Sequence, residues 1–335
     1  MLKSSSRISW LAVLMIAGCA GTSAPMMPRI QGPWWTVAHN PDLGELNGPP
    51  PAPRGGSQQP VDFSVWRAAD GSWQLWSCVR GTKCGGNTRL FYGWAGARLT
   101  DPDWRPMGIK MQADPKYGET LGGLQAPHVV RESGTYYLFY GDWANICLAR
   151  SKDGKSFERW LMPDGRAAMF NEGDKSNTRD PMVTVFREVH SGRWTPSEPI
   201  TWHCYYTASV AGVGADYCRT SKDLRTWSEP KMVARGGTTG TGGGSAECPY
   251  VLFHAGYYYL FRTQHYGGPP TTSVYRSKDP MDFGVDTDEK FVCLIEAAAP
   301  EIIVHDDQWY IAALLPDLQG IRIARLKWVP DGGVQ

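Results

Sequence analysis

One structural theme recurs five times along this chain, and it limits the possible folds more than any other feature. A proline or an acidic residue precedes three or four apolar residues, then come a Gly or Asp turn, an aromatic strand and a polar hairpin. The apolar segments are residues 60–66, 126–130, 180–186, 248–253 and 299–304, and the aromatic strands are residues 73–76, 136–140, 202–206, 257–261 and 309–312. Units two to four also end alike in Ser-Lys-Asp, at 151–153, 221–223 and 277–279, which we interpret as outer hairpin turns. An irregular β-sandwich would not explain this order, so we predict an all-β chain with a single five-bladed β-propeller over residues 57–330.

Charge and composition narrow the function classes. The 335 residues carry 34 Lys and Arg against 33 Asp and Glu, a formal net charge of +1, with no strongly basic block. A nucleic-acid partner therefore lacks its usual electrostatic basis, and none is expected. The 15 Trp and 15 Tyr favour strands and also provide flat surfaces on which sugars stack.

The first residues look like an export signal. Lys3 and Arg7 precede an apolar stretch that is too short to span a bilayer. Residues 16–19, Ile-Ala-Gly-Cys, resemble the bacterial lipobox, which implies a signal peptide over residues 1–18 and acylation of Cys19. An ordinary signal peptide cut nearby is the alternative. Because Ala20 is not the Asp associated with inner-membrane retention, we expect a lipoprotein of the outer membrane or cell surface, with residues 19–56 as a tether and Pro-rich entry segment.

Seven cysteines remain once Cys19 is set aside. In an oxidising compartment some should pair, and Cys78 with Cys84 and Cys204 with Cys218 are plausible local disulfides because each pair flanks an expected turn. No CxxC spacing is present and the seven His are scattered, so we expect neither a protein-built metal site nor a cofactor.

Three acids stand at the starts of first strands: Asp62, Asp180 and Glu247. The first strand of each blade lines the central channel of a propeller, so these side chains should converge on one mouth of it. Glycoside hydrolysis needs a carboxylic acid to protonate the leaving oxygen and a carboxylate that acts as base or nucleophile. The placement of the acids therefore predicts a glycosidase that acts on an oligo- or polysaccharide.

Short motifs around these acids resemble two families of glycoside hydrolases. Arg-Asp-Pro at 179–181 and Glu-Cys-Pro at 247–249 are similar to motifs of the family 32 fructan hydrolases, and Ala-Pro at 126–127 with the acid positions resembles the family 43 arabinanases and xylosidases. The resemblance implies that Asp62 is the general base or nucleophile, Asp180 an orienting or transition-state-stabilising carboxylate, and Glu247 the general acid. It also implies arabinan, fructan or xylan side chains as substrates. Family 32 retains and family 43 inverts the anomeric configuration, so both mechanisms stay open.

Blade one departs from both families, because Asp62 stands in Pro-Val-Asp-Phe. Asp42 is a rival for the acid of this blade, but the spacing of Asp62 to the Gly71 turn and the Trp73 strand suits the repeat better.

Other polar or aromatic residues at expected channel positions are candidates for binding sugar hydroxyls or stacking on sugar rings: Gln59, Trp94, Gln125, His128, Trp143, Arg179 and Glu301. His128 could equally be a structural histidine of the channel. Two other functions stay open: a glycoside phosphorylase, which would need further basic residues, and a catalytically silent glycan-binding propeller. We expect a monomer whose other partner is the membrane that holds its lipid anchor.

Overall fold

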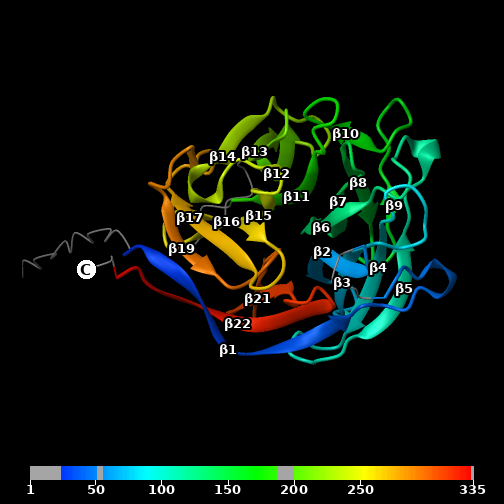
Figure 1. Ribbon diagram of the computed structural model, residues 1–335, viewed down its shortest axis with the longest axis horizontal. Helices are drawn as coiled ribbons and strands as arrows, with labels where there is room; N and C mark the ends of the chain where they lie inside the picture. The colour runs from blue at the N-terminus through cyan, green and yellow to red at the C-terminus, as the bar shows by residue number, and fades with distance from the viewer. Residues whose placement is uncertain (1–23, 51–55, 187–199, 333–335) are drawn as a thin grey trace, which may run out of the picture.

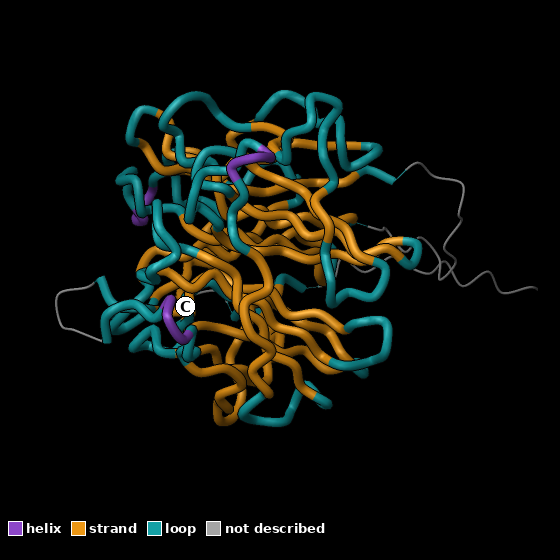
Figure 2. The backbone as a smooth tube through the Cα atoms, turned by 90° about the vertical axis from the view of Figure 1, so that its right-hand side faces the viewer, coloured by secondary structure: helices purple, strands orange, loops and turns teal. Residues whose placement is uncertain are grey.

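The computed structural model describes residues 24–50, 56–186 and 200–332. Five sheets, antiparallel except for one short parallel pair at the outer edge of the third, are arranged in a ring (Figure 1), which confirms the predicted all-β, five-bladed propeller. Strands make up the body of the molecule (Figure 2), and its described helices are three single 3₁₀ turns, η1 (Gly44–Leu46), η2 (Pro115–Tyr117) and η3 (Gly237–Thr239). Within the described ranges, no helix has the length and apolar character needed to cross a bilayer.

Each blade follows the repeat, with its first strand innermost. Blade one contains β2 (Gln59–Arg67), β3 (Trp73–Arg80), β4 (Leu90–Gly96) and β5 (Arg105–Met111). Blade two contains β6 (Gln125–Glu132), β7 (Thr135–Gly141), β8 (Ile146–Ser151), β9 (Glu158–Arg159) and β10 (Ala168–Phe170). Blade three contains β11 (Arg179–Val185), β12 (Trp202–Val210), β13 (Val213–Ser221), β14 (Lys231–Arg235) and β18 (Gly284–Val285). Blade four contains β15 (Glu247–His254), β16 (Tyr257–His265), β17 (Thr271–Ser277) and β19 (Phe291–Ile295).

Blade five joins the two ends of the chain. Its inner strands are β20 (Glu301–His305), β21 (Gln308–Leu314) and β22 (Gly320–Pro330), and its outermost strand is β1 (Met26–His39). The register of β1 against β22 runs from Met26 opposite Pro330 to His39 opposite Gly320, and Figure 1 shows the two strands side by side. Within the expected tether and entry segment over residues 19–56, residues 26–39 therefore form a strand that completes blade five and closes the ring.

The Ser-Lys-Asp segments form the predicted turns. The Asp153 carboxylate accepts backbone N–H bonds from Lys155 at 2.7 Å and Ser156 at 2.9 Å, and Asp223 accepts from Arg225 and Thr226 in the same way. Such side-chain to backbone bonds satisfy the orphan donors of a tight turn.

Neither expected disulfide is present, and all seven cysteines of the described residues are free thiols. On β12 and β13, Cys204 stands opposite Arg219 and Cys218 stands opposite Tyr205. This offset of one residue places the two side chains on opposite faces of the sheet. Cys78 instead directs its thiol to the Leu124 carbonyl, with Sγ and O 3.2 Å apart.

Candidate active site

A backbone irregularity near the start of each inner strand builds the mouth of the channel. The residues with positive φ there are Asp62 at 41°, Ala126 at 40°, Asp180 at 57°, Cys248 at 46° and Ala299 at 48°. In the first four blades the strand pairing shifts register at this residue, as expected of a β-bulge that re-aims a side chain. In blades two to five a proline follows, which cannot donate to the sheet. One cavity is lined by all five residues, so the repeat places five equivalent side chains around a single point.

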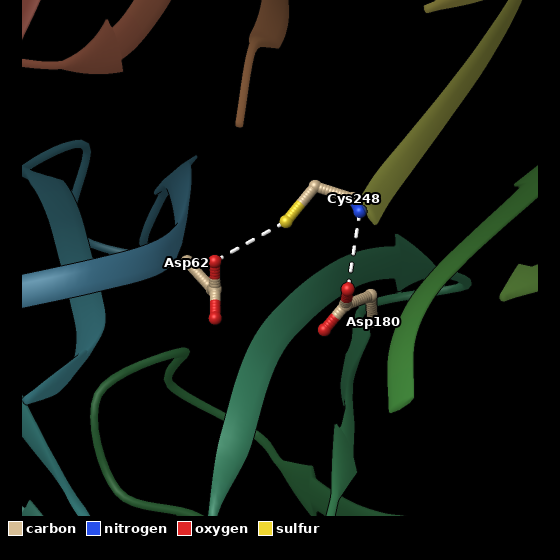
Figure 3. A group of neighbouring side chains, drawn as sticks. All are labelled: Asp62, Asp180 and Cys248. Carbon is tan, nitrogen blue, oxygen red and sulfur yellow. Dashed lines mark hydrogen bonds between the residues drawn. The ribbon is translucent and has the colours of Figure 1, made fainter. Parts of the chain in front are cut away.

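Two of these five positions carry carboxylates, and a third carries a thiol (Figure 3). The carboxylate of Asp62 accepts hydrogen bonds at Oδ1 from the Tyr266 hydroxyl, at 2.8 Å, and from the Cys248 thiol, at 3.2 Å. The backbone N–H of Cys248 donates to Asp180 Oδ2 at 3.1 Å, while Asp180 Oδ1 is buried and without a hydrogen-bond partner among the described residues. One oxygen of each carboxylate and Cys248 Sγ lie within 4.8 Å of one another, so Asp62 and Asp180 are brought together.

Glu247 lies beside this cluster in a two-pronged ion pair. Arg179 donates from Nε to Glu247 Oε2 at 3.0 Å and from Nη2 to Oε1 at 2.7 Å. The same guanidinium also donates to the carbonyls of Asn177 at 2.9 Å and Gly243 at 3.2 Å. Arg179 therefore joins blades three and four and fixes Glu247, the acid expected from the sequence, within reach of the mouth.

Burial and repulsion control the protonation of the cluster. The pKa of Asp180 is raised well above its usual range, first by burial and then by the charges of Glu247 and Asp62, with Arg179 opposing the shift. Burial raises the pKa of the Cys248 thiol and of the Tyr266 hydroxyl in the same direction. Cys248 and Tyr266 are therefore neutral donors to Asp62, and burial together with the neighbouring acids favours the protonated form of Asp180.

The same cluster is the one group of possible metal ligands in the described chain: Asp62, Asp180 and Cys248. A metal ion there would require the thiolate of Cys248, whose pKa is raised by burial and by both acids. In the structure these three groups form a hydrogen-bonded cluster, in which Cys248 donates from its thiol to Asp62 and from its backbone N–H to Asp180.

Three of the predicted sugar-binding residues, Gln59, Gln125 and Trp143, are not among the residues that line the mouth cavity. Gln59 is half-buried, and its side-chain oxygen accepts from Arg80 Nε at 3.1 Å and Nη2 at 2.8 Å. Gln125 is buried with its side-chain oxygen unpartnered, and Trp143 is 36% exposed in the loop after β7.

Two other predicted residues, His128 and Glu301, line a second cavity together. His128 Nδ1 is 3.7 Å from Glu301 Oε1, while His128 Nε2 lies 3.1 Å from the Val183 carbonyl oxygen. Burial raises the pKa of Glu301, which lines both the mouth cavity and a second cavity shared with His128.

Two sequence candidates fall outside the site. Trp94 is 2% exposed and packs against Tyr92 with ring centres 4.9 Å apart, so the expectation that it stacks on a sugar is wrong. Asp42 is an exposed turn acid that accepts from the Gly44 N–H at 2.9 Å and from Asn47 Nδ2 at 2.6 Å. The blade-one position at the mouth is occupied by Asp62 instead.

Sequence reasoning missed three residues of the mouth. Tyr266 follows β16 and reaches Asp62 across the channel, a contact between residues 204 positions apart. Cys248 was visible as part of a motif, but its thiol contact with Asp62 depends on the bulge. Arg89 immediately precedes β4, and no pattern of spacing distinguishes it from an ordinary loop arginine.

Solved structures share this arrangement of blades. The chain matches a thermostable family 43 glycoside hydrolase with a TM-score of 0.59 and 17% identity, over 82% of this chain and 91% of that one. The fold is that of the family 43 and family 32 glycoside hydrolases. An α-L-arabinanase of Cellvibrio cellulosa, solved with arabinohexaose, matches at TM-score 0.57 and 18% identity, over 82% of this chain and 94% of that one.

A family 32 β-fructofuranosidase of Bombyx mori, solved with sucrose, matches at TM-score 0.56 and 17% identity over 86% of this chain and 61% of that one. No protein-family model matches the sequence, and a search of curated proteins finds no match. The similarity is therefore one of fold.

Proposed function

We propose that this protein is a glycoside hydrolase that cleaves an oligo- or polysaccharide at the mouth of its channel. The observation that carries the proposal is the convergence of Asp62 and Asp180 on one cavity, with Glu247 fixed beside them by Arg179. Three carboxyl groups from three blades meet the chemical demand of glycosidic bond cleavage. The neighbours of known fold, among them an arabinanase solved with arabinohexaose and a fructofuranosidase solved with sucrose, support the same class of substrate.

In this proposal each acid has a distinct task. Asp62, which accepts two hydrogen bonds at Oδ1, is the base that activates water or the nucleophile that attacks the anomeric carbon. Asp180 is the carboxyl group that orients the sugar or stabilises the transition state, and its raised pKa favours the protonated form, which can donate a hydrogen bond to the sugar. Glu247 protonates the leaving oxygen, which requires that the bound sugar displace Arg179 from at least one of its oxygens.

Sugar release tests this proposal. Wild-type protein is incubated with arabinan, arabinogalactan, fructan and xylan, beside the variants Glu247→Gln and Asp62→Asn. The proposal predicts that at least one substrate releases sugar and that both variants lose that release. A protein that binds the panel and leaves it intact would instead be the glycan-binding propeller.

The site suits a glycoside phosphorylase less well than a hydrolase. Phosphorolysis needs a cluster of free cations at the mouth, and Arg179 is already paired with Glu247. Adding inorganic phosphate to the same assay distinguishes the two reactions, because phosphorolysis yields a sugar phosphate.

We also propose that the mature protein is an acylated monomer on the outer membrane or cell surface. Cys19 and the signal peptide lie outside the described residues, so this rests on the lipobox-like sequence alone. Mass spectrometry of the protein purified from bacterial membranes tests it: an acylated N-terminal Cys19 is expected, and an unmodified N-terminus further along the chain would contradict it.

A further inference from the structure

An arginine, Arg89, lies near the acids of the channel mouth but forms no ion pair with a described carboxylate. Arg89 lies between blades one and two, where its backbone N–H donates to the Gly122 carbonyl at 2.9 Å. Its guanidinium stacks over the ring of Trp143, with 5.1 Å from the guanidinium carbon to the ring centre. Asp62 and Asp180 lie close enough to Arg89 to influence its pKa, and both act to raise it.

The guanidinium of Arg89 makes few polar contacts within the described chain. Its one side-chain hydrogen bond within the described chain is to Cys78 Sγ, at 3.9 Å, and burial raises the pKa of that thiol to about 12, so the partner is neutral. The other arginine of the mouth, Arg179, has both its Nε and its Nη2 on a carboxylate. No described carboxylate lies within 4.0 Å of the Arg89 nitrogens, although a partly buried charge is costly when it is unpaired.

Trp143, whose ring stacks against the Arg89 guanidinium, is partly exposed to solvent. Its side chain is 36% exposed, and its backbone has φ of 79°, which is rare for a bulky residue. The turn is held by Asp142, which is fully buried and accepts the N–H groups of Ala144 at 3.0 Å and Asn145 at 2.6 Å. Residues with strained backbone persist only where the surrounding contacts hold them in place, and they are concentrated at active sites and ligand-binding sites.

We propose that Arg89 and Trp143 form a subsite for a sugar that carries a single negative charge, the carboxylate of a uronic acid or a sulfate ester. The free edge of the guanidinium pairs with the anionic group, and the exposed part of the indole contacts the sugar ring beside it. This inference rests on the proposed function, because it names the class of sugar that the glycosidase binds.

The surrounding charges favour a monoanion over free phosphate. Asp62 lies close to Arg89, and Arg179 is paired, so a dianion at the mouth would meet one free cation and at least one negative charge. A carboxylate or sulfate ester on the sugar carries one charge and matches the two-pronged geometry of a guanidinium.

Binding measurements test the subsite directly. Calorimetry would compare glucuronic- and galacturonic-acid oligosaccharides, the same oligosaccharides with their carboxyl groups chemically reduced, sulfated oligosaccharides and inorganic phosphate. The variants are Arg89→Gln and a matched control, Arg98→Gln, which removes a blade-one arginine whose side chain is 79% exposed and paired with Asp101.

We expect wild type to bind an acidic oligosaccharide about 10- to 100-fold more tightly than its reduced counterpart, the range expected for charge-assisted hydrogen bonds. Arg89→Gln should abolish that difference, whereas Arg98→Gln should preserve it. The uronate and sulfate arms identify which anionic group is preferred. Equal affinity for acidic and reduced sugars, an unaltered Arg89→Gln protein, absence of any binding, or phosphate binding as tight as that of the acidic sugar would each overturn the inference.

If Arg89→Gln does not fold, the salt dependence of binding by the wild-type protein tests the subsite instead. The wild-type preference for acidic over reduced sugar should then fall with rising salt, and a salt-independent preference would contradict an ionic contact. Failure of this inference also differs from failure of the proposed function. Hydrolysis of neutral sugars without acidic preference refutes only the subsite, whereas Arg89-dependent binding without hydrolysis refutes only the glycosidase.

Discussion

The ion pair between Arg179 and Glu247 should contribute measurably to the stability of the propeller. The side chain of Arg179 is 6% exposed and that of Glu247 is 17% exposed, and two hydrogen bonds of 3.0 and 2.7 Å join them. Removal of one partner from a buried pair typically costs about 3–5 kcal/mol, because the other charge is left unpaired. Since Glu247 retains some contact with solvent, we expect Arg179→Met to lower the free energy of unfolding by about 3 kcal/mol, the lower end of that range.

A double-mutant cycle measured by urea unfolding separates the pair from its surroundings. Arg179→Met and Glu247→Gln should each destabilise the protein, and the double variant should lose about 1.5–3 kcal/mol less than the sum of the two. The control is Arg98→Met, which removes an exposed pair with Asp101 and should lower the free energy of unfolding far less than Arg179→Met does. Additive effects of the two site variants, or a loss for Arg179→Met no larger than for the control, would refute the reasoning.

Three further predictions follow from the fold and the mouth. Because the pKa of Asp180 is raised in the folded protein, the folded state holds a proton that the unfolded chain loses above about pH 4. The free energy of unfolding should therefore fall as the pH rises above about 4. In thermal melts, Asp180→Asn should become more stable than wild type as the pH approaches neutrality. Parallel pH profiles of the two proteins would contradict this. Ala299 has a φ of 48°, so Ala299→Gly should leave the free energy of unfolding unchanged or raise it. Ala298 has no positive φ, so Ala298→Gly should lower the free energy of unfolding by about 1 kcal/mol. Equal losses in the two variants would argue against a strained bulge. Deletion of residues 1–40 removes β1 and should abolish cooperative melting, whereas deletion of residues 1–23 should preserve it. Cooperative melting of the 1–40 deletion would show that the propeller does not need β1.

The sequence could predict the blades and the acids because both follow from a local repeat. The same order of apolar strand, turn and aromatic strand returns in each blade, so Asp62 and Asp180 could be assigned to equivalent positions at the mouth. The closing strand β1 was missed because it pairs with β22 at the far end of the chain and lies outside the repeat.

The spacing of residues in the sequence could not predict side-chain contacts across the channel. Tyr266 bonds to Asp62 from another blade, and Arg89 reaches the mouth from a loop. Trp94 was misplaced because its direction depends on which face of β4 it occupies, and that face packs into the core. The expected Cys204–Cys218 bridge failed for a similar reason, since a register offset of one residue turns the two side chains apart.

The most direct test of the central claim is the turnover of Asp62→Asn and Glu247→Gln on the best substrate of the panel, with Asp42→Asn as the matched control. Asp42 is an exposed turn acid of the same segment of chain, so its variant should retain wild-type activity. The account predicts that Asp62→Asn and Glu247→Gln, folded as judged by their melting transitions, each lose at least about 100-fold in kcat, the lower range for an acid or base catalyst. Near-wild-type turnover in either variant, or an equal loss in Asp42→Asn, would show that the channel mouth is not where the glycosidic bond is cleaved.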